Sequence, residues 1–294
     1  MEAKVRRFVR RALRRLRGKK RRGAGPRESL FADRWLSALL DQLTREEGKR
    51  IRPSYTWGVL HAAHLARALG VRRISALELG VAGGNGLCAL ERAAIRAEEL
   101  FGVDIDVFGF DSGVGLPPPR DYRDLPNLFS GGDYAMDADR LRERLERAQL
   151  LIGPLDETIR PFLESGPAAI AFIAFDLDYY TSTMDALLLL EAHHELLMPR
   201  VHCYFDDVML YTISDYAGER LAITEFNETH EQRKISPIYG LRYRLPRRFR
   251  DSSFSEQYYM AHIFQHPRYN ERDGLVSPRA GKVALRLRPR RRSP

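Results

Sequence analysis

The amino-acid sequence predicts an α/β fold in which helices cover both faces of a mostly parallel sheet. Three observations carry this prediction. Short apolar runs suited to strands alternate with stretches of helical periodicity from residue 74 onward. The run 168–176 is apolar at nearly every position, which is typical of a strand buried on both faces. The chain has 294 residues, of which 44% are hydrophobic, so it can bury a full core.

The elements follow from periodicity and from the residues that end each segment. Two helices precede the first strand, at about 30–44 and 55–69, and Gly70 ends the second of them. Further helices are expected over 86–100, 137–148, 156–163, 181–197 and 216–230. Strands are expected over 74–80, 103–111, 150–153, 168–176, 201–207, 239–245 and 257–264. Seven strands are therefore predicted, with extra helices at the N-terminus.

The net charge of +9 is concentrated in the two tails. Residues 1–22 hold twelve Lys or Arg and one Glu, and residues 279–292 hold seven basic residues and no acid, so the rest of the chain carries −9. Apolar residues in 1–22 recur at three- and four-residue steps, which predicts a basic amphipathic helix. An anionic membrane surface is one partner for such a helix. The alternatives are a solvated leader that docks on its own domain, nucleic acid as a less favoured partner, and an organelle transit peptide.

Composition also bears on the compartment. Two cysteines indicate a reducing environment rather than a disulfide framework, no apolar run reaches the ~20 residues of a membrane span, and the N-terminus has no apolar signal region. We therefore expect a cytoplasmic protein, with residues 1–22 able to hold it at the inner membrane surface.

The first strand runs into a glycine-rich turn, ELGVAGGNG, which contains Glu78, Gly80 and Gly84. Glycines after a strand let the backbone approach a ligand closely, and the following helix offers free N–H groups. An acid two residues before the first glycine can accept from an ammonium group, which favours a cofactor that carries an amino acid. The second strand ends at Asp111, where a pair of ribose hydroxyls would need an acceptor. The alternatives are a turn that only packs helix on strand, and an Asp that opens a Gly/Pro turn.

Four carboxylates follow the two strands at 168–176 and 201–207: Asp176, Asp178, Asp206 and Asp207. Neighbouring parallel strands lie ~4.8 Å apart, so these acids would share one rim of the sheet. Carboxylates that lie so close together raise one another's pKa unless a cation lies among them. Hard oxygen ligands of this kind favour Mg²⁺ or Ca²⁺. Capping of the following helices by Asp178 and Asp206 is the alternative. The histidines at 202, 230, 262 and 266 are weak candidates for a general base.

Taken together, these stretches resemble class I S-adenosylmethionine-dependent methyltransferases. More narrowly, FGFDSGVGLP, FDLDYYTSTMDAL and YFDDV are similar to the macrocin/mycinamicin sugar O-methyltransferase family, over about residues 54–230. The resemblance implies a Rossmann-like methyltransferase fold whose last strand is antiparallel. It implies S-adenosylmethionine bound by Glu78, Gly80, Gly84, Asp111 and Asp176, and Mg²⁺ held by Asp178, Asp206 and Asp207, with Asp178 the catalytic residue. The acceptor would be a hydroxyl of a sugar, glycan-like molecule or other small natural product.

The chain is thus divided into a basic amphipathic helix and linker (1–26), an N-terminal helical segment (27–72), the methyltransferase domain (73–270) and a basic tail (271–294). Two other functions stay open. A metal-dependent glycosyltransferase could use the Asp-x-Asp at 176–178, although it leaves the glycine turn and Asp111 without a role. A non-enzymatic module with basic tails could associate with a membrane or with nucleic acid. A dehydrogenase fits less well, and a homo-oligomer is compatible with the sequence.

Overall fold

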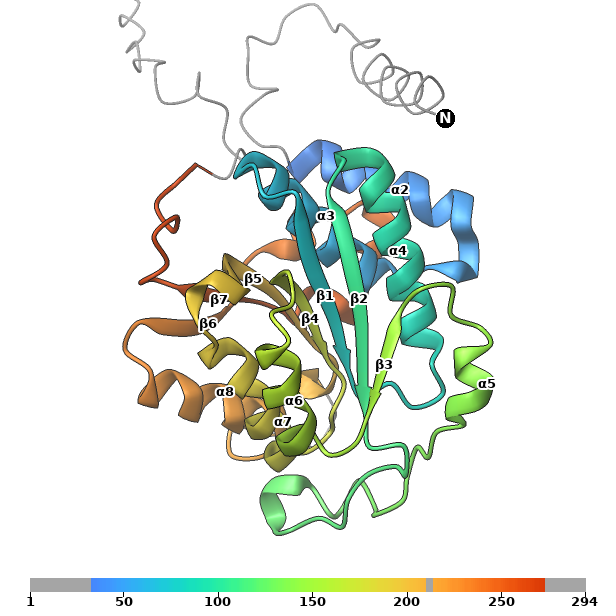
Figure 1. The fold of residues 1–294 in the computed structure, drawn as a ribbon, viewed down its shortest axis with the longest axis vertical. Coiled ribbons are helices and arrows are strands. Elements are labelled where there is room, and N and C mark those ends of the chain that lie inside the picture. The colour runs from blue at the N-terminus through green and yellow to red at the C-terminus, as the bar shows by residue number, and fades with distance from the viewer. Residues whose placement is uncertain (1–32, 210–213, 273–294) are drawn as a thin grey trace, which may run out of the picture.

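The computed structural model describes residues 33–209 and 214–272 (Figure 1). The predicted amphipathic helix over residues 1–22 and nearly all of the basic tail lie outside these ranges. No helix within them is both long and apolar enough to cross a bilayer.

A seven-stranded sheet forms the centre of the molecule, in the order β3-β2-β1-β4-β5-β7-β6 (Figure 1). The strands are β1 (Arg73–Leu79), β2 (Asp104–Asp111), β3 (Gln149–Ile152), β4 (Ala169–Phe175), β5 (Leu197–Phe205), β6 (Arg233–Pro237) and β7 (Tyr258–Ile263). The pairs among β1 to β5 are parallel, whereas β7 is antiparallel to β5 and to β6. The predicted Rossmann-like fold with an antiparallel last strand is confirmed.

Helices cover the two faces of this sheet, each over its own apolar core. One face is covered by α2 (Asp33–Glu47), α3 (Pro53–Ala68) and α4 (Asn85–Phe101), so the two predicted N-terminal helices are part of the main core. The opposite face is covered by α6 (Leu155–Glu164), α7 (Tyr180–Leu187) and α8 (Gly218–Thr229). The α3 helix approaches β4 closely at Gly58. A Cβ at this position would lie 2.3 Å from the Phe172 ring.

Alternation along β1 and β4 decides where their polar ends point. Ala76 and Ala174 pack in the core beneath α3 and α4, whereas Leu77 and Leu79 pack on the other face. Because successive strand residues point to opposite faces, Glu78 and Asp176 lie on the α3–α4 side of the sheet. The N-terminal helices are therefore placed to form one wall of any pocket at these strand ends.

Three predicted elements were wrong in extent or type. The helix expected over 181–197 ends at Leu187. Leu197, at the end of the expected range, is instead the first residue of β5 and pairs with Ile170. The helix expected over 137–148 is the short α5 (Ala138–Arg142). Its continuation is replaced by a turn in which the backbone N–H groups of residues 146–148 donate to the Glu91 carboxylate.

The sixth strand was placed too late in the sequence. Residues 239–245 form a 3-10 turn at Leu241–Tyr243 instead of a strand, and β6 lies earlier, at Arg233–Pro237. Gly240 has a positive φ of 74°, which breaks extended backbone, and Leu241 and Leu245 then pack into the core beside α2 and α3. Tyrosine and leucine residues in turn at every second position of 239–245 therefore give this stretch the period-two pattern of a strand.

Candidate active site

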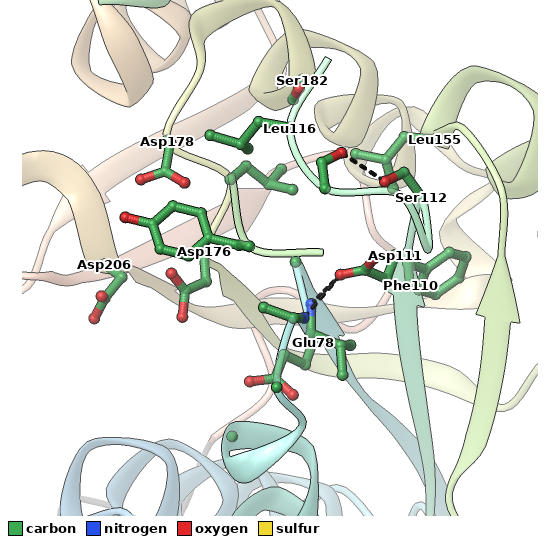
Figure 2. A pocket seen from close by; sticks show the side chains of 18 of the residues that line it. Glu78, Phe110, Asp111, Ser112, Leu116, Leu155, Asp176, Asp178, Ser182 and Asp206 are labelled. Carbon is green, nitrogen blue, oxygen red and sulfur yellow. Dashed lines mark hydrogen bonds between the residues drawn. The ribbon is translucent and has the colours of Figure 1, made fainter. Parts of the chain in front are cut away.

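One cavity of about 790 Å³ lies at the carboxyl ends of β1, β2, β4 and β5 (Figure 2). In parallel sheets these ends form the usual ligand site. The glycine turn after β1 lines one side of the cavity, and the carboxylates after β4 and β5 line the other. All eight predicted site residues line this single cavity, namely Glu78, Gly80, Gly84, Asp111, Asp176, Asp178, Asp206 and Asp207.

The glycine turn is shaped by close approaches that no side chain would allow. Gly80 has φ +83°, and a Cβ there would lie 1.8 Å from the carbonyl oxygen of Asp176. Gly84 has φ +78° and caps the N-terminus of α4 without a side-chain hydrogen bond. The turn is therefore drawn against the end of β4, and the first N–H groups of α4 face a pocket lined by glycines.

Glu78 is fully buried at the end of β1, beneath the turn. Its Oε1 accepts from the Tyr55 hydroxyl at 2.8 Å, while Oε2 has no hydrogen-bond partner. A Cβ at Gly86 would lie 1.8 Å from Oε1, so the glycine at that position leaves space for the carboxylate. Burial, with a contribution from the nearby Asp176 carboxylate, raises the pKa of Glu78 to about 8. A buried, unpartnered oxygen of this kind is the feature expected of a site that receives a donor from a ligand.

Arg52, the N-cap residue of α3, lines this side of the pocket, and Tyr55 in the first turn of α3 is buried between Arg52 and Glu78. The Arg52 Nη1 atom donates to the Tyr55 hydroxyl at 2.9 Å and lies 3.6 Å from Asp176 Oδ2. Neither residue was predicted as a site residue from the sequence. Arg52 could not be singled out among the many arginines, because its position depends on how α3 packs against the sheet.

Asp111 has a more structural role than a free ribose acceptor. Its Oδ2 accepts from the backbone N–H groups of Val81 and Ala82 at 2.9 and 2.8 Å, and its Oδ1 accepts from Gly113 at 2.7 Å. The carboxylate therefore ties the glycine turn to the end of β2. A carboxylate has about four acceptor positions, so three amides leave one of them, on Oδ1, for a ligand.

The opposite side of the pocket holds carboxylates with little compensating charge. Burial and the Asp206 carboxylate raise the pKa of Asp176 to about 7, and burial together with Asp176 raises the pKa of Asp178 to about 7. Asp178 has φ +59°, a strained conformation for a residue other than glycine. Its N–H donates to Asp207 Oδ2 at 3.1 Å, which helps to hold this conformation.

Asp206 and Asp207 differ in how the protein holds them. Asp206 Oδ1 accepts from the Tyr204 hydroxyl at 2.6 Å. Asp207 is buried, its N–H donates to Glu219 Oε2 at 2.9 Å, and burial next to Asp178 raises its pKa. Glu219 lies in the first turn of α8 and has an unpartnered Oε1 atom, and it was not predicted as a site residue. No sequence pattern marks it, because an acid at a helix N-terminus is common.

The predicted metal ligands share a rim without forming a closed cage. No three of the carboxylates at 176, 178, 206, 207 and 219 offer oxygen atoms within 4.8 Å of one another. Their oxygen chemistry suits Mg²⁺, but their spacing in this structure is too open for three protein ligands on one ion. None of the four histidines considered as a general base lines the cavity, and His202 is buried beside Trp57.

A loop between β2 and α5 forms the outer wall of the pocket. Val114, Leu116 and Tyr134 line the cavity, and the Leu116 N–H donates to the Asp133 carbonyl at 2.8 Å. The buried Asp124 anchors the loop to α7, because its Oδ1 accepts from the Thr181 N–H at 2.9 Å and from the Thr181 hydroxyl at 3.0 Å. Tyr134 is 57% exposed at the mouth, and partial desolvation of its hydroxyl, together with the Asp178 carboxylate, raises its pKa.

No protein-family model matches this chain, and neither does any curated protein sequence. Solved structures do resemble it. One is CalS11, described as a calicheamicin methyltransferase, with 20% identity over 74% of this chain and 95% of that chain and a TM-score of 0.47. Another is the O-methyltransferase NovP, with 16% identity over 72% and 81% and a TM-score of 0.49. An apo structure of CalS11, described as a TDP-rhamnose 3′-O-methyltransferase, has 20% identity over 71% and 88% and a TM-score of 0.41. The strand order and the pocket, rather than these scores, establish the fold.

Proposed function

We propose that this protein is an S-adenosylmethionine-dependent O-methyltransferase that acts on a hydroxyl group of a sugar or glycan-like acceptor. One observation carries the proposal: a single cavity joins the glycine turn, with the unpartnered Glu78 oxygen beneath it, to a rim of carboxylates. The first side suits a cofactor with an amino-acid end, and the second suits a polyhydroxylated acceptor. The stretches FGFDSGVGLP, FDLDYYTSTMDAL and YFDDV, which resemble sugar O-methyltransferases, all contribute residues to this cavity.

The charges beside the glycine turn match the amino-acid end of S-adenosylmethionine. Glu78 Oε2 can accept from the ammonium group, and Arg52, partly exposed in the cavity, can pair with the carboxylate. Asp176 Oδ2 lies 3.6 Å from Arg52 Nη1. In the free protein, Arg52 and Asp176 pair with each other. In the complex, Arg52 would also pair with the cofactor carboxylate, and Glu78 would pair with the cofactor ammonium group.

The transfer itself needs positioning and one proton acceptor. When bound, S-adenosylmethionine supplies an electrophilic methyl group, so a C–O bond forms to the acceptor oxygen as the C–S bond breaks. Asp178 lines the cavity, and its backbone N–H is held by Asp207. We assign Asp178 the role of the base that accepts the proton of the acceptor's hydroxyl group. The proton is then released to water through the open mouth. The Tyr134 ring, which lines the same cavity, can stack on the acceptor.

Metal assistance is an alternative proposal, in which Asp178 serves as a metal ligand instead of as the proton acceptor. Asp178, Asp206 and Asp207 would hold Mg²⁺, and the raised pKa values of Asp178 and Asp207 are those of carboxylates that lack a neutralising cation. Because no three oxygens converge within 4.8 Å, a bound ion would need water ligands or movement of these side chains. Mg²⁺ would bring positive charge to the rim where the acceptor hydroxyl lies.

The test is a transfer assay with S-adenosylmethionine labelled at its methyl group and a panel of nucleotide-linked deoxysugars, with and without Mg²⁺. The proposal predicts label in the sugar as an alkali-stable ether. Calorimetric titration with S-adenosylmethionine and with nucleotide sugars separates the alternatives. A glycosyltransferase would release the nucleoside diphosphate, bind no S-adenosylmethionine and transfer no methyl group.

A further inference from the structure

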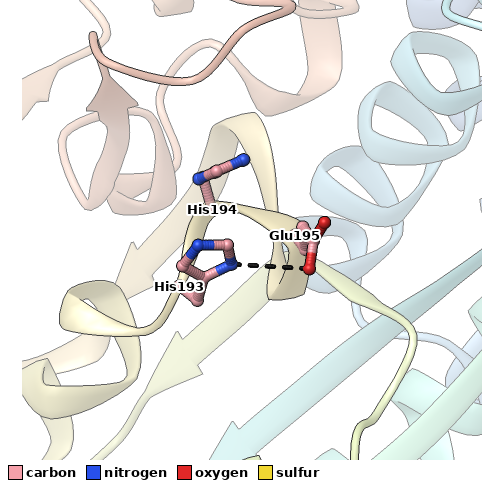
Figure 3. Close-up of side chains that lie close together, drawn as sticks. All are labelled: His193, His194 and Glu195. Atoms are coloured by element: carbon pink, nitrogen blue, oxygen red, sulfur yellow. Dashed lines mark ion pairs between the residues drawn. The ribbon is translucent and has the colours of Figure 1, made fainter.

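A second cluster of chemically active side chains lies at the opposite end of the sheet. His193, His194 and Glu195 directly precede β5, on a short stretch that includes the 3-10 turn His194–Leu196 (Figure 3). Leu197 of β5 pairs with Ile170 near the beginning of β4, whereas the pocket lies beyond the other ends of these strands. The cluster is therefore separate from the proposed active site.

The three side chains gather around one point. Each offers one ligand atom, and these atoms all lie within 4.8 Å of one another. His193 Nδ1 lies 3.5 Å from Glu195 Oε2, and the centroids of the two imidazole rings are 4.2 Å apart. Metal–nitrogen bonds of about 2.0–2.1 Å in a tetrahedral site place neighbouring ligand atoms about 3.4 Å apart. Binding would require rotation of these side chains to bring the ligand atoms from within 4.8 Å to that spacing.

The backbone beneath the cluster is well held although two of its three residues, His193 and Glu195, are exposed. The Leu196 N–H donates to the His193 carbonyl at 2.9 Å, and Arg233 Nη1 donates to the Ala192 carbonyl at 2.9 Å. The side chains of His193 and Glu195 are 64% and 79% exposed. An ion can therefore reach the three residues from solvent.

His266 lies next to this cluster but is engaged elsewhere. Its ring centroid is 5.7 Å from that of His194. Its Nδ1 accepts from the Arg268 N–H at 3.0 Å, and its ring also forms a hydrogen bond with the Leu197 backbone. With its ring nitrogens engaged in this way, His266 lies beside the site and leaves three protein ligands.

We propose that His193, His194 and Glu195 bind a divalent transition-metal ion of the Zn²⁺, Ni²⁺ or Cu²⁺ class. Two imidazoles and one carboxylate suit these ions, whereas Mg²⁺ and Ca²⁺ prefer oxygen ligands alone. Among residues 33–209 and 214–272, this is the one group of three or more such side chains whose ligand atoms come this close. Three protein ligands leave at least one position for water.

The bound ion would clamp the turn that leads into β5. It would stabilise the folded chain by an amount that grows with the logarithm of the Zn²⁺ concentration above Kd, and it would not alter methyl transfer at the far end of the sheet. Binding requires neutral imidazoles, so it weakens on acidification.

Calorimetric titration of the full chain with ZnCl₂ alone tests the site. We expect one Zn²⁺ per chain with a rise in Tm, and at least a tenfold loss of affinity in the double variant His193→Asn/His194→Asn, which loses two of three ligands. Glu195→Gln should show a smaller loss. The matched control His230→Asn changes a histidine outside the cluster and should bind as the unmodified chain does.

The acid rim is the competing location for Zn²⁺, and Asp178→Asn distinguishes it. The proposal requires Zn²⁺ binding to survive Asp178→Asn. It is overturned if the unmodified chain binds no Zn²⁺, if the double histidine variant binds as well as the unmodified chain, or if Asp178→Asn removes the binding. Circular dichroism of each variant confirms that the fold is intact.

Discussion

The two sides of the pocket differ in how far the protein itself satisfies their polar groups. On the glycine side, the Asp111 carboxylate accepts three backbone N–H groups, and the turn is pressed against the end of β4. On the acid side, the pKa values of Asp176, Asp178 and Asp207 are raised, and Arg52 forms an ion pair with Asp176. The glycine side is preformed apart from the unpartnered Glu78 Oε2 atom, whereas the acid side lacks positive charge that a ligand would bring.

Asp178→Asn gives the largest expected loss of activity. Removing the proton acceptor should lower kcat by about 10²–10⁴-fold while affinity for S-adenosylmethionine changes little, because the glycine side is untouched. Steady-state transfer kinetics and calorimetry on the same sample measure both quantities. Asp104→Asn, at the far end of β2, is the matched control and should leave both unchanged. If cofactor affinity falls as far as kcat does, the two sides are not independent.

Gly80→Ala tests how rigidly the glycine side is built. The added Cβ would lie 1.8 Å from the Asp176 carbonyl oxygen at a positive φ, so we expect more than about 2 kcal/mol of lost stability together with lost cofactor binding. Gly70→Ala is the matched control, since Gly70 has φ +70° with nothing within 4 Å of the added Cβ. That variant should lose about 1 kcal/mol from backbone strain alone. Equal losses in urea denaturation of the two variants would mean that close approach at Gly80 does not matter.

Glu78→Gln should act in the opposite way to Asp178→Asn. Loss of the charged acceptor for the ammonium group should weaken S-adenosylmethionine binding about 10–100-fold, with a smaller effect on kcat at saturating cofactor. Glu164→Gln, on the exposed end of α6, is the control. Unchanged cofactor affinity in Glu78→Gln would remove the assigned role.

The buried carboxylates on both sides of the pocket also predict a pH dependence of stability. The folded-state pKa of Glu78 is about 8 and those of Asp176 and Asp178 are about 7, all above the ordinary values of 4.5 for Glu and 3.8 for Asp. The folded state therefore binds more protons than the unfolded state between about pH 4 and 8, and stability falls as pH rises through this window. Each such group contributes up to about 1.4 kcal/mol per pH unit.

Calorimetric Tm values of the cofactor-free protein at pH 5.5, 7 and 8.5 check this sign. We expect the highest Tm at pH 5.5 and a flatter profile in Glu78→Gln. Mg²⁺ at pH 8.5 should restore part of the lost Tm if it binds the acid rim. A Tm that rises steadily from pH 5.5 to 8.5 would contradict the raised pKa values of these carboxylates.

Tyr134→Ala has the smallest expected effect. Loss of a stacking ring at the mouth should raise KM for the sugar a few-fold, with kcat and cofactor affinity unchanged. Tyr122→Ala changes another exposed tyrosine of the same loop region and is the matched control. Equal KM values in the two variants would exclude Tyr134 from the acceptor site.

Patterns with a local physical cause could be predicted from the sequence. The buried strand at 168–176, the glycine turn and the acids at the strand ends follow from apolar runs and turn chemistry. The fold could therefore be predicted, and so could a pocket with the glycine turn and the carboxylates at the strand ends. Arg52, Tyr55 and Glu219 were not, because their roles arise from packing of α3 and α8 against strand ends far away in the sequence. Asp111 lines the cavity at the end of β2, its cofactor role stays a prediction, and its three amide partners depend on the folded turn.

The most direct test is a crystal structure of the full chain with S-adenosylhomocysteine, solved with and without Mg²⁺. We predict the ammonium group within hydrogen-bond distance of Glu78 Oε2 and the sulfur atom turned toward Asp178. A ligand bound outside this cavity, or with its amino-acid end away from Glu78, would contradict the assignment of the two sides.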